Sequence, residues 1–114
     1  LIMVQERTTD EVRTDFIKYL WYLIDYWLSE SRRPDTKEKL EGLVHSILSL
    51  IDGGYIGLPK FILAPDPHPD DKDYHISNNQ YYYPENYPTN IKSDISGSLH
   101  ELFYKIELER KRKK

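Results

Sequence analysis

An unbroken helical spacing of apolar residues between Asp35 and Asp52 constrains the fold more than any other feature of the chain. The apolar positions recur three or four residues apart and are Leu40, Leu43, Val44, Ile47, Leu48 and Ile51. This spacing places side chains along one face of an α-helix. Asp35 and Glu38 have the pattern of a helix start, and Gly53 can adopt the left-handed conformation that ends one. We therefore expect a helix over residues 35–52 whose apolar stripe is covered by other segments.

Two further segments have helical patterns. Residues 8–30 begin with a capping box from Thr8 to Glu11, and their apolar arc is wide enough to predict cover on more than one side. Residues 95–112 have a similar start from Ser98 to Glu101 and a shorter stripe. Within the 35–52 helix, Gly42 is unfavourable unless a neighbouring segment approaches closely there.

The region from 53 to 94 lacks this periodicity and is rich in proline, tyrosine and aspartate. We predict a mainly α fold, in which three helices are wrapped by this long irregular loop with at most one short strand or hairpin, near residues 60–64. The tyrosines in the second half of this loop predict that it is ordered against the helices; they are Tyr74, Tyr81, Tyr82, Tyr83 and Tyr87.

The 114 residues predict one domain, residues 1–114. Residues 1–7 are expected to be a flexible N-terminus or in part a cloning remnant, because the only methionine is Met3. Residues 108–114 are expected to be a basic tail. The absence of cysteine excludes disulfides and cysteine nucleophiles. No apolar run is long enough for a membrane span and no leader pattern is present, so we expect a cytoplasmic protein without membrane contact.

The densest group of chemically capable side chains is the stretch 66–75. Its histidines and aspartates are ligand types that suit a divalent transition metal such as zinc, and the candidate ligands are His68, Asp70, Asp71 and His75. The alternative is structural, with aspartate side chains accepting hydrogen bonds from nearby backbone amides.

The string His68-Pro69-Asp70-Asp71 resembles the motif of the PIG-L/LmbE-like zinc deacetylases. That resemblance implies zinc ligation by His68 and Asp71, with Asp70 as general base. Lys72 stands where the family has glutamate. A metal-dependent hydrolase that uses loop 66–75 is therefore the alternative functional hypothesis.

A second resemblance, to small uncharacterised proteins of bacteriophages and other mobile elements, extends over more of the chain. It rests on residues 40–43, 46–48, 52–53, 65–75 and 98–103. It implies an accessory or inhibitor-type protein.

Our leading hypothesis is a non-enzymatic protein-binding domain without a cofactor, which also forms a homodimer through aromatic residues of the first helix. Tyrosine and tryptophan are favoured at interfaces. The candidate contact residues are Trp21, Trp27, Tyr74, Tyr81, Tyr82 and Tyr83. The net charge of −3 argues against nucleic acid as a partner, apart from contacts of the basic C-terminal tail.

Overall fold

The computed structural model describes residues 5–32, 34–84 and 91–112. These ranges contain four helices: α1 (Thr9–Ser29), α2 (Thr36–Ile51), α3 (Asp71–Ser77) and α4 (Leu99–Arg112). No strand occurs in these ranges, including residues 60–64. The prediction of a mainly helical chain is confirmed. The predicted count of three helices is wrong, because α3 lies inside the segment expected to be irregular.

Contacts divide the chain into two compact units. Leu1–Phe61 and Ser93–Lys114 form the first, which contains α1, α2 and α4, and Ile62–Lys92 form the second, which contains α3. Whether the two units fold as a single domain stays a prediction. Of the predicted flexible N-terminus, residues 1–4 lie outside the described residues.

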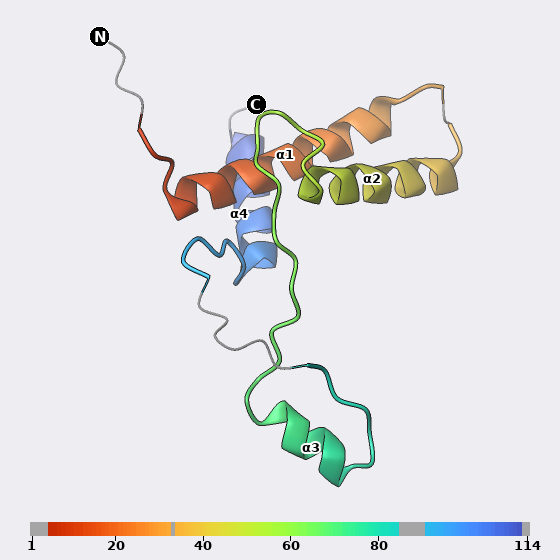
Figure 1. The fold of residues 1–114 in the computed structure, drawn as a ribbon. Helices are drawn as coiled ribbons and strands as arrows, with labels where there is room; N and C mark the ends of the chain where they lie inside the picture. Colours follow the sequence, from red (N-terminus) through yellow and green to blue (C-terminus); the bar gives the residue numbers. More distant parts are fainter. Residues whose placement is uncertain (1–4, 33, 85–90, 113–114) are drawn as a thin grey trace. The chain divides into compact units, whose positions relative to one another are not determined.

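Helix α1 is the centre of the first unit. It packs against both α2 and α4, with α2 running back beside its C-terminal part and α4 crossing it (Figure 1). The buried core joins α1 to the other elements and consists of Phe16, Ile17, Leu50, Leu58 and Ile106. The predicted cover on more than one side of α1 is therefore present.

Each tryptophan of α1 is used in a contact with a different helix. The Trp21 ring stacks on Phe103 of α4, with ring centroids 4.2 Å apart, and its indole N–H donates to the Phe103 carbonyl oxygen at 3.0 Å. The Trp27 indole N–H donates to the Ser46 hydroxyl of α2 at 2.9 Å. A Cβ at Gly42 would lie 2.5 Å from Trp27 ring atoms, so the expected close approach at this glycine is confirmed.

The ends of α1 and α2 follow the sequence signals. Thr8 and Glu11 form the predicted capping box at the start of α1. At the end of α2, Gly53 has φ of 93°, its N–H donates to the Leu50 carbonyl, and the Gly54 N–H donates to the Ser49 carbonyl. These two bonds form a Schellman motif, which satisfies carbonyls left free at the helix end.

Two expectations from the sequence need correction, one about the start of α4 and one about the cover of α2. Ser98 precedes α4 with φ of +52°, whereas a capping-box residue is extended. The apolar stripe of α2 is only partly covered: Leu43, Ile47 and Ile51 are half-buried, but Leu40, Val44 and Leu48 are 59%, 56% and 54% exposed. The described part of the chain thus leaves an open apolar row on α2.

The packing of Trp27 over Gly42 predicts that the effect of Gly42→Ala on stability changes sign when Trp27 is replaced. Gly42→Ala should destabilise the protein, although alanine is about 1 kcal/mol better than glycine inside a helix, because the added methyl group collides with the Trp27 ring. In a Trp27→Leu background the same substitution should stabilise by about 1 kcal/mol. Denaturant unfolding of the four proteins measures both effects, and an equal effect in the two backgrounds would contradict the packing.

The capping box predicts a pH dependence. Hydrogen bonds from the backbone and side chain of Thr8 hold the pKa of Glu11 below its ordinary value. A lowered pKa means that this stabilisation is complete above the ordinary carboxyl pKa and is lost as pH falls through the lowered value. In Glu11→Gln, which cannot ionise, unfolding free energy should fall less steeply in acid than in the unchanged protein. Parallel pH profiles would refute the prediction.

Candidate binding site

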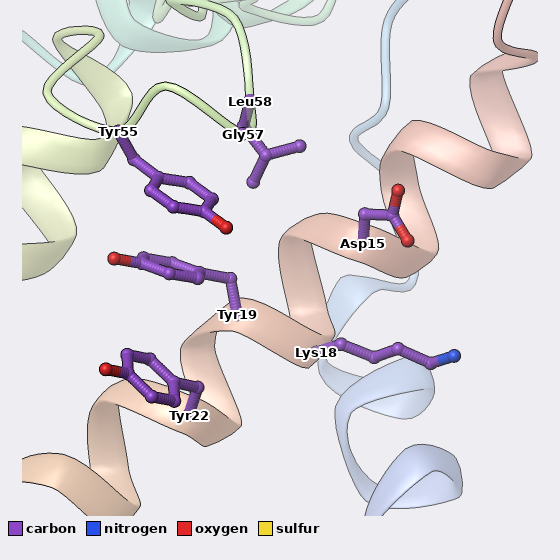
Figure 2. Close-up of a pocket in the computed structure, with 7 residues that line it drawn as sticks. All are labelled: Asp15, Lys18, Tyr19, Tyr22, Tyr55, Gly57 and Leu58. Carbon is purple, nitrogen blue, oxygen red and sulfur yellow. The ribbon is translucent and has the colours of Figure 1, made fainter.

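A pocket of about 470 Å³ lies where the N-terminal half of α1 meets the segment after α2. Its lining comes entirely from the first unit and consists of Asp15, Lys18, Tyr19, Tyr22, Tyr55, Gly57 and Leu58. Figure 2 shows three tyrosine rings in a row, with Asp15 on the preceding turn of α1 and the Lys18 side chain extending away from the rings. Helical spacing accounts for this arrangement, because residues three or four apart share a face.

The three tyrosine rings come from α1 and from the segment after α2, and ring stacking and core packing fix their positions. Tyr19 and Tyr55 stack with centroids 4.0 Å apart and planes 16° apart, and Tyr22 lies 5.4 Å from Tyr19. Tyr19 and Tyr55 also pack against the core. A Cβ at Gly57 would lie 2.5 Å from the Tyr55 ring, so glycine there allows the ring to fold back over its own loop. Burial, with the neighbouring tyrosines, raises the pKa of Tyr19.

The polar side of the pocket has one anionic group that already pairs with a guanidinium. The Arg7 side chain, from the segment before α1, donates to the Asp15 carboxylate. Both side chains are partly open to solvent, so water screens the pair. The Asp15 carboxylate and the exposed Tyr22 ring both attract positive charge, whereas Lys18, the other charged residue of the lining, repels it.

The two tryptophans proposed as contact residues lie elsewhere. Both are only partly exposed, and their indole N–H groups bond to Phe103 and Ser46 within the first unit. The Arg110 guanidinium lies 4.9 Å from the Trp21 ring centroid and pairs with Asp25 of α1. The wide apolar arc of α1 is thus covered here by α4.

The four tyrosines proposed in the loop belong to the second unit. All are exposed, from 50% for Tyr82 to 100% for Tyr81. The Lys72 ammonium lies 5.3 Å from the Tyr82 ring centroid, a weak cation–π contact, and the Tyr74 ring meets His75 edge-on. These exposed rings are available for contact, and their role stays a prediction.

The predicted metal ligands are engaged in the turn that starts α3. The Asp70 N–H donates to His68 Nδ1 at 3.1 Å, and the His68 N–H donates to the Asp71 carboxylate at 2.9 Å. His75 Nδ1 lies 2.9 Å from the Gln80 side-chain oxygen, at the other end of the helix. Within the described ranges, no three His, Cys, Asp or Glu side chains are placed to hold a metal ion. The metal-hydrolase hypothesis stays untested, while the hydrogen bonds match the structural alternative.

Helix α3 has a local feature at each end, acidic residues in its first turn and a turn with positive φ after its last residue. Asp71 and Asp73 lie in its first turn, where acidic groups suit the positive end of the helix dipole. At its other end Asn79 has φ of 56°, its N–H donates to the Ile76 carbonyl, and the Gln80 N–H donates to the His75 carbonyl. This is a second Schellman motif, with asparagine in the position that Gly53 has after α2.

The predicted basic tail is helical as far as the structure describes it, since α4 continues to Arg112. Residues 113–114 lie outside the described residues. Lys111 pairs with Glu107 at 3.7 Å, and Arg110 belongs to the contact with α1. Among the described helices, none combines the length and apolarity needed to cross a bilayer.

The sequence interpretation did not identify the pocket residues. Neither Tyr19 nor Tyr22 was among the candidate contact residues. The available signal was the pair Tyr55 and Gly57 directly after a helix end, since a glycine two residues from an aromatic ring permits close approach. Compared with protein-family models, curated proteins and solved structures, the chain shows no match to any of them.

The second Schellman motif predicts the response of α3 to substitution at Asn79. Asn79→Gly should preserve or increase helicity at 71–77, because glycine adopts positive φ without strain. Asn79→Val should reduce it, since a β-branched residue at positive φ costs at least about 1 kcal/mol. Cα chemical shifts measure the helicity, and equal shifts in the two variants would rule out the motif.

Proposed function

We propose that this chain is a non-catalytic protein-binding domain that also forms a homodimer. The observation that carries the binding role is the pocket whose lining contains the tyrosine rings of residues 19, 22 and 55 together with Asp15. Tyrosines offer large contact area with little rotamer entropy to lose, which is why they are frequent at interfaces. The accessory or inhibitor role implied by the phage-protein resemblance is part of this proposal.

The chemistry of the pocket favours a basic side chain of the partner, arginine in particular. A guanidinium can stack on an aromatic face while its N–H groups bond to a carboxylate. The Arg7–Asp15 pair provides an internal example of the second interaction. The net charge of −3 also favours association with a basic partner.

Two substitutions should change binding in opposite directions. Asp15→Asn removes the anion and should weaken binding, whereas Arg7→Ala removes the internal competitor and should strengthen it. Tyr22→Ala should weaken binding roughly two- to fivefold, since an exposed cation–π contact contributes about 0.5–1 kcal/mol. Tyr22 is the suitable ring because it is 56% exposed, so its removal leaves the core intact.

The experiment is an NMR titration with a capped Gly-Arg-Gly peptide, followed at the ring protons of Tyr22 and Tyr55. Saturable shifts with the arginine peptide, and none with Gly-Gln-Gly, are expected. Tyr104→Ala is the control, because Tyr104 is 61% exposed on α4 and outside the pocket. Equal responses to the two peptides, or weaker binding by Arg7→Ala, would refute the arginine site.

A further inference from the structure

The open row on α2 faces away from the helix that covers the rest of α2. Leu40, Val44 and Leu48 are spaced four residues apart, and each is more than half exposed. At 100° per residue Val44 lies opposite Gly42 and Ser46, the two positions that meet Trp27 of α1. Three large aliphatic side chains in one row are typical of a helix face that another helix covers.

The row is self-complementary. It reads leucine, valine, leucine in both directions, with Val44 at its centre. If a second copy of α2 lies antiparallel about a two-fold axis at Val44, each Val44 meets its own counterpart and each Leu40 lies near the other copy's Leu48. A symmetric dimer requires this kind of patch, in which the same residues supply both halves of the contact.

The charges beside the row select the antiparallel orientation. Lys37 lies seven residues before Val44 and Asp52 lies eight after it, and both are exposed. In an antiparallel pair, Lys37 of one copy lies opposite Asp52 of the other. In a parallel pair, Lys37 would lie opposite Lys37, and Asp52 opposite Asp52. Like charges facing each other are unfavourable, so complementarity supports the antiparallel arrangement.

We propose that two copies of the chain associate through α2, antiparallel, with the two-fold axis at Val44. This inference specifies the surface through which the proposed homodimer forms, and it rests on the homodimer part of the proposed function. Sixteen residues give α2 a length of about 24 Å. One such helix pair buries less than the roughly 800 Å² per partner of a standard interface, so a dissociation constant in the micromolar range is expected.

Single-cysteine variants locate the interface, because the chain contains no cysteine. Under mild oxidation Val44→Cys should form disulfide-linked dimers, since the two-fold axis brings the two Cβ atoms within bonding range. Leu108→Cys, at a position 55% exposed on α4, is the matched control and should link more slowly. A mixture of Leu40→Cys and Leu48→Cys should link faster than either variant alone, which reports the antiparallel orientation.

Charge exchange gives a second readout without crosslinking. Lys37→Asp and Asp52→Lys should each weaken the dimer, and the double variant should restore it. Each substitution places a charge that suits the dipole at its end of α2. Lys37→Asp also removes the exposed Lys37–Glu41 pair, so Glu41→Ala, which removes the same pair without changing Lys37, is its control for helix stability. Sedimentation equilibrium from about 1 µM to 1 mM covers the expected affinity.

Two results would overturn the inference, and they are distinguishable. A monomer mass at every concentration would remove both this interface and the homodimer of the proposed function. A dimer in which Val44→Cys links no faster than Leu108→Cys would remove the α2 interface and leave the homodimer in place. Binding of the arginine peptide to the tyrosine pocket is independent of both results.

Discussion

The packing of Trp21 and Trp27 against different helices is the interaction on which the first unit depends. Both residues belong to α1, yet Trp21 stacks on Phe103 of α4 and Trp27 lies over Gly42 of α2. Their indole N–H groups also find acceptors on those helices, so burial leaves neither donor unpaired. Helix α1 therefore organises α2 and α4 through two aromatic contacts that are chemically alike but separate along the helix.

This use of α1 determines which surfaces stay available. Because Trp21 and Trp27 take part in internal contacts, the rings of α1 that stay exposed are the tyrosines Tyr22 and Tyr26. Helix α2 turns its glycine and serine face to Trp27, and the opposite row of aliphatic residues is consequently open. On the N-terminal half of α1, Tyr19 and Tyr22 meet the returning segment at Tyr55 and form the pocket. Both proposed contacts are thus consequences of how α1 packs.

Residues 35–52 could be interpreted from sequence because periodicity, cap and glycine exit agree. Helix α1 could be interpreted because its periodicity and its capping box agree. Helix α3 could not, since seven residues show no apolar period and its exit uses Asn79 in place of glycine. Its aspartates and histidines suggested a metal, whereas the side chains of His68 and Asp71 accept hydrogen bonds from the local backbone. The tyrosine pocket depends on a meeting of residues 19 and 55, and spacing along the chain carries no signal for such a long-range contact.

The central claim is that the tryptophans of α1 serve internal packing while the outer row of α2 is open for association. A dilution series of amide and indole NMR spectra tests it most directly, since both tryptophans and every α2 amide report in one spectrum. The account predicts concentration-dependent shifts at Leu40, Val44 and Leu48, with the indole signals of Trp21 and Trp27 unchanged. Shifts of the two indole signals on dilution, with α2 unchanged, would contradict it.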